Sequence, residues 1–134
     1  MRTARGQLIA VVDDDDSVRK AICRLLQVAG FAARGFANGR EFLDAWLTEP
    51  PDCTVLDLHM PGMSGIDIQA RLKRLRPQAA IIFITAHDRP ETRQQCLDAG
   101  AAAYLRKPVD AVTLVATLDE VLSGRRQPQT RSRE

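Results

Sequence analysis

Long hydrophobic runs are missing from this chain. No apolar stretch approaches the roughly 20 residues that a helix needs to cross a bilayer. The run at residues 8–12 leads into acidic residues, where a signal peptide would have a small-residue cleavage site. We therefore expect a cytoplasmic protein without membrane contact. Its 134 residues, 45% hydrophobic and 27% charged, fit one domain with a single core.

Cysteine and histidine are also scarce. The three cysteines, Cys23, Cys53 and Cys96, are far apart and form no CxxC motif or Cys/His cluster. This spacing argues against a disulfide framework and against a zinc site. We interpret the cysteines as small buried hydrophobes without a function of their own.

Positive charge is concentrated at the two ends of the chain. The net charge is +2, of which residues 1–6 contribute two positive charges and residues 124–134 contribute three, so residues 7–123 carry about −3. Nothing in this acidic body resembles a nucleic-acid groove. We expect residues 1–6 to form an N-terminal extension and residues 124–134, which lack apolar side chains, to form a disordered basic tail or linker stub.

What the chain does contain is a regular alternation of short apolar runs with amphipathic stretches. All candidate strands except the second are nearly continuously apolar, which is typical of parallel strands buried on both faces. The candidate strands are residues 8–12, 31–36, 53–58, 80–85 and 102–105. Each is followed by apolar residues at helical spacing, within residues 18–29, 42–47, 66–75, 96–99 and 112–122. The pattern predicts five βα units of an α/β fold.

Local signals mark several helix ends. Gly30 and Gly100 occupy positions where a helix commonly ends in the left-handed conformation. Asp88 predicts the N-cap of the fourth helix, with Pro90 in its first turn. This helix has the narrowest apolar stripe, at residues 96–99, and we expect it to dock loosely, as a moving element must.

Four consecutive aspartates follow the first strand. Neighbouring carboxylates repel one another unless a cation lies among them. In a doubly wound parallel sheet, ligands collect outside the carboxyl ends of the strands, and in the strand order 2-1-3-4-5 Asp13 and Asp14 would face Asp57 there. Such a cluster suits Mg²⁺, for which Mn²⁺ could substitute. Asp15 and Asp16 are better interpreted as residues that cap the first helix.

Two further strand ends supply the remaining parts of a phosphoryl-binding site. Thr85 closes the fourth strand with a hydroxyl group, and Lys107 follows the fifth strand with an ammonium group. Phosphoryl transfer depends mainly on positioning and charge neutralisation. A metal, a lysine and a hydroxyl around Asp57 would therefore suffice to form an aspartyl-phosphate.

Four segments resemble the signature blocks of response-regulator receiver domains. They are Val12-Asp13-Asp14, residues 56–65 with the sequence LDLHMPGMSG, Ile84-Thr85-Ala86 and residues 104–108 with the sequence YLRKP. The resemblance covers about residues 7–123. It implies a CheY-like, flavodoxin-like (βα)5 fold, in which three layers are built around a doubly wound five-stranded parallel sheet of order 2-1-3-4-5.

The resemblance implies a role for each matching acid. Asp57 would be the phosphoacceptor, taking a phosphoryl group from a phosphohistidine of a sensor histidine kinase. Asp13, Asp14, Asp57 and the backbone carbonyl of His59 would hold Mg²⁺.

The resemblance also implies roles for the ends of the fourth and fifth strands. Thr85, Ala86 and Lys107 would bind the phosphoryl oxygens. Thr85 and Tyr104 would be switch residues, with Tyr104 turning inward into the space that Thr85 leaves. This movement would reshape the surface of the fourth helix, fifth strand and fifth helix. The bond between Lys107 and Pro108 would be cis.

His59 and His87 are the only histidines of the chain, and each lies two residues beyond a site residue, Asp57 and Thr85 respectively. In receiver domains these variable positions flank the path of the hydrolytic water. We predict that both histidines tune the lifetime of the phosphorylated form. The rival interpretation is solvent-exposed filler.

Three functions compete for these motifs. The first is a phosphoacceptor switch of a two-component phosphorelay, which is no enzyme beyond its own phosphorylation and dephosphorylation. The second is a magnesium-dependent phosphatase with an aspartate nucleophile, of the haloacid-dehalogenase type. Such phosphatases need an acid two residues after the nucleophile, where this chain has His59, and a cap region for which it has no room. The third is a receiver-like module that has lost phosphorylation, although nothing that phosphorylation needs is missing.

The output of the switch is less well defined. The chain is similar to receivers of the FixJ type, which are usually followed by a helix-turn-helix transcription domain. We expect either a stand-alone phosphorelay receiver or a truncated transcription regulator, without direct nucleic-acid binding unless a further domain is present. A phosphorylation-dependent homodimer through the weakly packed fourth helix is a further hypothesis.

Overall fold

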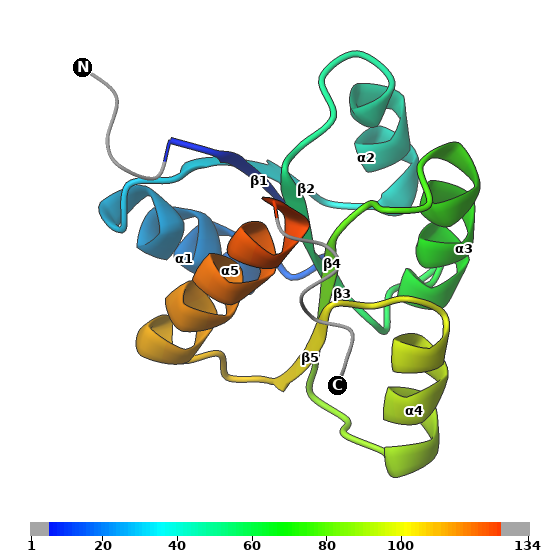
Figure 1. Ribbon diagram of the computed structural model, residues 1–134. Helices are drawn as coiled ribbons and strands as arrows, with labels where there is room; N and C mark the ends of the chain where they lie inside the picture. Colours follow the sequence, from blue (N-terminus) through cyan, green and yellow to red (C-terminus); the bar gives the residue numbers. More distant parts are fainter. Residues whose placement is uncertain (1–5, 127–134) are drawn as a thin grey trace.

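A computed structural model describes residues 6–126 of the chain, in which strands and helices alternate (Figure 1). The strands are β1 (Leu8–Val12), β2 (Ala32–Phe36), β3 (Cys53–Asp57), β4 (Ile81–Thr85) and β5 (Ala103–Arg106). The helices are α1 (Asp16–Val28), α2 (Gly39–Trp46), α3 (Gly65–Leu75), α4 (Pro90–Asp98) and α5 (Ala111–Arg126). Within residues 6–126, every helix is too short or too polar to span a bilayer.

The five strands form one parallel sheet in the order β2-β1-β3-β4-β5, which confirms the predicted fold class. The register places Val12 beside Leu56, Leu56 beside Phe83 and Phe83 beside Tyr104. The carboxyl ends of four neighbouring strands therefore lie along the same edge of the sheet. The winding reverses between β1 and β3, so the loops that follow these two strands diverge to opposite faces and leave room for a site between them.

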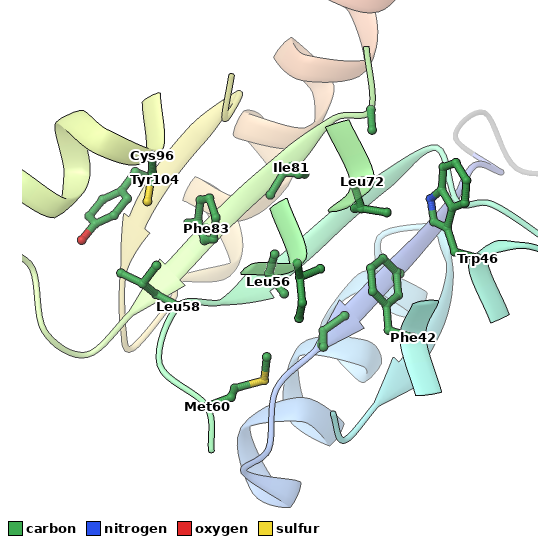
Figure 2. Packing of buried hydrophobic residues seen from close by; sticks show 14 residues of the cluster. Phe42, Trp46, Leu56, Leu58, Met60, Leu72, Ile81, Phe83, Cys96 and Tyr104 are labelled. Atoms are coloured by element: carbon green, nitrogen blue, oxygen red, sulfur yellow. The ribbon is translucent and has the colours of Figure 1, made fainter. Parts of the chain in front are cut away.

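Helices cover both faces of the sheet, with α1 and α5 on one side and α2, α3 and α4 on the other (Figure 1). Alternate residues of each strand supply the two cores, as the two-residue period of a strand requires. In β1, Ile9 and Val11 pack with α1 and α5, whereas Ala10 and Val12 pack on the opposite face. Figure 2 shows the second core, in which Phe42 and Trp46 of α2 lie near Leu56 of β3 and Leu72 of α3.

The strand predictions agree with the structure to within one residue at each end, whereas the N-cap predicted for the fourth helix differs. Helix α2 begins at Gly39, three residues before the first apolar residue of its predicted pattern, because the side chain of Asn38 caps it by accepting a hydrogen bond from the Glu41 amide at 2.9 Å. Helix α4 has Arg89 as its N-cap, without a side-chain hydrogen bond, and the prediction of Asp88 was wrong. A residue before proline favours an extended backbone, so Pro90 makes its neighbour Arg89 the N-cap.

The last helix runs through Arg126, so the first three residues of the predicted tail are helical and that boundary was placed too early. Extending a formed helix costs little, because each added residue brings its own hydrogen bond. The remainder of the predicted tail, and residues 1–5 of the predicted extension, lie outside the described residues. Gly30 and Gly100 follow their helices with φ values of 100° and 103°, as predicted.

Candidate functional site

Three carboxylates meet at the carboxyl edge of the sheet. Asp57 ends β3 and Asp13 follows β1, and these strands are neighbours. One oxygen from each of Asp13, Asp14 and Asp57 lies within 4.8 Å of the others. Asp13 and Asp57 are buried, whereas Asp14 is exposed. The structure thus brings together the acids that the sequence singled out.

Lys107 supplies the positive charge of this cluster. Its ammonium nitrogen is 2.9 Å from Oδ2 of Asp13 and 3.4 Å from Oδ1 of Asp57. The backbone amide of Lys107 donates to the Thr85 carbonyl at 2.8 Å, and the bond to Pro108 is cis. Burial opposes the charge, but the carboxylates of Asp13 and Asp57 together raise the pKa of Lys107. Lys107 is therefore positively charged at neutral pH.

The carboxyl group of Asp57 is strongly perturbed. Burial, and next the charge of Asp13, raise its pKa to about 7, against the opposing effects of Lys107 and the His59 backbone. A single ammonium group therefore does not compensate the buried acids. A further cation beside them would restore the charged form of Asp57.

The donor set fits a hard dication. Oδ1 of Asp13 accepts a hydrogen bond from the Asp15 amide at 2.9 Å, and among residues 6–126 the buried Oδ2 of Asp13 is paired only with the Lys107 ammonium, at 2.9 Å. Carboxylate and carbonyl oxygens are the ligands that Mg²⁺ and Mn²⁺ prefer. Within residues 6–126, these acids are the only group of three or more His, Cys, Asp or Glu side chains close enough to share an ion.

The other two aspartates of the run belong to α1. Asp15 is the N-cap, and its side chain accepts a hydrogen bond from the Val18 amide at 3.1 Å, as predicted. Asp16 lies in the first turn and forms an ion pair with Arg19. The run therefore divides into acids of the site and acids of the helix start.

Thr85 is buried at the end of β4, and its hydroxyl group is bonded to the next loop. Oγ1 accepts a hydrogen bond from the His87 amide at 3.0 Å and donates to the His87 carbonyl at 3.2 Å. Ala86 is exposed between these residues. The imidazole ring of His87 lies 5.6 Å from that of His59, centroid to centroid, across the gap between the β3–α3 and β4–α4 loops.

Tyr104 of β5 already faces inward, with 6% of the residue exposed. Figure 2 shows its ring beside Cys96 of α4, in the core that also contains Phe83. The guanidinium group of Arg93 lies over the ring, 5.6 Å from its centroid. The inward position that we predicted for the switched state is thus present here, while the Thr85 hydroxyl group remains bonded to His87.

The loop between β3 and α3 carries His59 and is held at both ends. Met60 is buried in the core, and Ser64 forms a capping box with Asp67 at the start of α3. Gly65 lies so close to β3 that a Cβ atom there would be 2.7 Å from the backbone oxygen of Asp57. A side chain at this position would therefore displace the phosphoacceptor candidate.

Arg19 is a site residue that the sequence interpretation missed. Its Nη1 donates to the backbone carbonyl of Asp13 at 2.8 Å. Its aliphatic stem lies on Gly35 of β2, where an added Cβ atom would be 3.1 Å from Cγ and Cδ of Arg19. The position of this arginine, three residues after Asp16 on the first helix, was the available signal.

Comparisons with known proteins agree with this geometry. Residues 9–119 match the family model of the response regulator receiver domain. The chain is 36% identical over 119 residues to the DNA-binding transcriptional regulator NtrC of Klebsiella pneumoniae, covering 89% of this chain and 25% of that protein. It therefore spans about a quarter of the length of this relative.

Solved structures extend the likeness to the whole fold. A response regulator receiver protein from Burkholderia phymatum is 47% identical with a TM-score of 0.77, covering 87% of this chain and 95% of that one. The chemotaxis protein CheY4 of Vibrio cholerae is 30% identical with a TM-score of 0.82, covering 87% and 98% respectively. The finer resemblance to FixJ-type receivers stays a prediction. The family match and the acidic site together show that this chain belongs to the response-regulator receiver domains, the phosphoacceptor domains of two-component signalling.

Proposed function

We propose that Asp57 is the phosphoacceptor of this receiver domain and takes its phosphoryl group from a sensor histidine kinase, the general kind of partner that the family implies. One observation carries the proposal: the Asp57 carboxylate lies at the carboxyl edge of the sheet with Lys107 at 3.4 Å and with the carboxylates of Asp13 and Asp14 within 4.8 Å. This arrangement combines a nucleophile, a fixed cation and ligands for a second cation.

The chain's residues divide the work of the transfer. An oxygen of Asp57 forms a bond to phosphorus while the bond from phosphorus to the kinase histidine nitrogen breaks, and the imidazole keeps the electron pair. Lys107, the Ala86 amide and the Thr85 hydroxyl group bind the phosphoryl oxygens. When bound by Asp13, Asp14, Asp57 and the His59 carbonyl, Mg²⁺ or Mn²⁺ supplies the positive charge that these oxygens need.

The switch depends on hydrogen bonds that the Thr85 hydroxyl group must break. To reach a phosphoryl oxygen, its hydroxyl group has to leave the His87 backbone, which frees the β4–α4 loop. Tyr104 is already buried, so we assign the first movement to Thr85 and the loop. The change then spreads to the surface formed by α4, β5 and α5.

Phosphorylation by acetyl phosphate tests the acceptor. With Mg²⁺ we expect one phosphoryl group per chain, stable in acid and labile in base, measured by mass spectrometry. Asp57→Asn should abolish it, whereas Asp44→Asn, which removes an exposed carboxylate of α2, should not. Labelling that persists in Asp57→Asn would overturn the assignment. Continuous turnover of a small phosphoester without a stable phosphoprotein would instead favour the alternative of an aspartate-nucleophile phosphatase.

His59 and His87 flank the open side of the site, where both residues are exposed. We propose that their rings tune the lifetime of the phosphorylated form by controlling the approach of water to Asp57. The decay rate of phosphorylated His59→Ala and His87→Ala should differ from that of the wild type. Unchanged decay in both variants would refute this role.

The output that we propose is control of transcription, because curated relatives are DNA-binding transcriptional regulators in which the matched domain is one part. A phosphorylation-dependent homodimer through α4 fits this output, since Cys96 is the only buried residue of that helix. Sedimentation with and without beryllofluoride, a phosphoryl mimic, tests the dimer. A mass that does not change on adding beryllofluoride would exclude it.

A further inference from the structure

The two histidines of the chain form a pair that the phosphoacceptor chemistry does not require. Their ring centroids are 5.6 Å apart and their planes make an angle of 72°. Both residues are exposed, and within residues 6–126 neither imidazole has a hydrogen bond or an ion pair. The contact joins two different loops, because His59 follows β3 and His87 follows the neighbouring strand β4.

The backbones beneath both rings are fixed. The amide and carbonyl groups of His87 are both bonded to the Thr85 hydroxyl group. His59 lies between Leu58, whose amide donates to the Ile84 carbonyl at 3.0 Å, and Met60, which is buried. The fold therefore presents the two imidazoles side by side with little backbone freedom, although their side chains can still rotate at the surface.

The ring separation fits one shared metal ion. An imidazole nitrogen binds zinc at about 2.0–2.1 Å, which places the ring centre roughly 3.2 Å from the ion. Two rings at that distance with centroids 5.6 Å apart subtend an angle of about 120° at the ion. This angle is compatible with a four-coordinate site completed by water.

The ligand type separates this pair from the oxygen cluster. Imidazole nitrogen suits Zn²⁺, Ni²⁺ and Cu²⁺, whereas Mg²⁺ prefers oxygen ligands. Asp57 lies two residues before His59, and the acidic cluster at this edge of the sheet favours the approach of any cation. We propose that the imidazole rings of His59 and His87 together bind one transition-metal dication of the zinc type, through nitrogen atoms that are not among the proposed magnesium ligands.

An ion on both rings has a mechanical consequence. It ties the β3–α3 loop to the β4–α4 loop and holds His87 in place. The Thr85 hydroxyl group then stays bonded to the His87 backbone and cannot reach a phosphoryl oxygen. The occupied pair thus opposes the phosphorylated state. This consequence rests on the function proposed above, whereas the binding itself does not.

Zinc titration of the full chain tests the site, with excess Mg²⁺ present to saturate the oxygen cluster. The imidazole nitrogen resonances report directly, because the chain has no other histidine. We expect both to shift on binding one Zn²⁺ per chain, and calorimetry to show an affinity at least about tenfold weaker in His59→Ala and in His87→Ala. Asp14→Asn, which removes only an oxygen ligand, should still show the histidine shifts.

Three outcomes would overturn the proposal. They are no zinc-dependent shift of either imidazole, a shift of one ring that persists when the other is removed, or zinc binding that is lost in Asp14→Asn but kept in both histidine variants. For the consequence, Zn²⁺ should slow phosphorylation by acetyl phosphate in the wild type more than in the histidine variants. If Zn²⁺ slows phosphorylation equally in the wild type and in the histidine variants, the proposed effect of the bound ion on Thr85 is refuted. Labelling of the wild type with Mg²⁺ alone remains a separate test of the acceptor.

Discussion

At the scale of single residues, Arg19 shows how a side chain outside the acidic cluster can set its geometry. It donates to the Asp13 carbonyl at 2.8 Å, and its stem lies over Gly35, where an added Cβ atom would crowd it. We expect Arg19→Met to weaken Mg²⁺ binding to the unphosphorylated chain about tenfold, because the β1–α1 loop loses its support. Arg19→Lys should restore only part of this affinity, since an ammonium group cannot reproduce the planar fork of donors.

Calorimetry with Mg²⁺ measures this effect, and Lys20→Met is its matched control. Lys20 is exposed and adjacent, so its loss changes the net charge equally without touching the Asp13 carbonyl. A similar loss of affinity in Lys20→Met would show that Arg19 acts through net charge and not through position.

The raised pKa of Asp57 predicts a pH-dependent stability for the metal-free chain. Its pKa is about 7 in the folded chain against an ordinary value of 3.8, so the folded state binds this proton more tightly than the unfolded state. The resulting stabilisation is fully present below a pH of about 4 and is lost as the pH rises through about 7. Asp57→Asn cannot ionise, so at pH values above this window it should exceed the wild type in stability by on the order of a few kcal/mol.

Urea unfolding in the presence of a chelator, repeated across this pH range, provides the measurement. The difference between Asp57→Asn and wild type should shrink toward low pH. Asp44→Asn, at an exposed position, should track the wild type throughout. A constant difference between Asp57→Asn and wild type at all pH values would contradict the assigned cause.

At the scale of elements, a buried polar contact joins α4 to α3. Gln69 of α3 is 1% exposed, and its Nε2 donates to the Cys96 carbonyl at 3.0 Å. That carbonyl also accepts from the Ala101 amide, so losing Gln69 leaves it with a partner. We expect Gln69→Leu to cost about 1 kcal/mol of global stability and to speed amide hydrogen exchange in α4 more than in α3.

Hydrogen exchange measured residue by residue tests this prediction. Gln94→Leu is the control, because Gln94 is exposed on α4 and bonds only within its own helix, to Asp98. If exchange in α4 is the same in Gln69→Leu as in wild type, the contact does not hold the helix in place.

The elements also show why some features were predictable from sequence and others were not. Strands β1, β3 and β4 were predicted to within a residue because burial on both faces leaves an apolar run that the chain shows directly, whereas β2 is largely exposed and has no such run. Asp57 and Lys107 were identified because each follows such a run. Gln69 was missed because its partner Cys96 is 27 residues away, and a polar side chain on a helix otherwise predicts solvent exposure.

At the scale of the whole molecule, the site lies where elements of both hydrophobic cores meet. It lies at the edge of the sheet where β1, β3, β4 and β5 end, between the helices of opposite faces. No unfolded chain would hold the three carboxylates within 4.8 Å of one another. Cation binding to this site therefore adds to the stability of the entire domain.

Because cation binding stabilises the domain, unfolding free energies can test which aspartates of residues 13–16 hold the cation and which belong to the start of α1. At a Mg²⁺ concentration about tenfold above the dissociation constant, wild type should gain about 1.4 kcal/mol of unfolding free energy. Asp13→Asn should lose this increment, because it removes a ligand. Asp15→Asn should keep it, because asparagine caps a helix about as well as aspartate and the Asp15 side chain is bonded to the Val18 amide.

Urea unfolding with and without Mg²⁺ measures the increment in the wild type and in both variants. Loss of the increment in Asp15→Asn would place that residue among the ligands and contradict the division, since the two changes remove the same charge two positions apart.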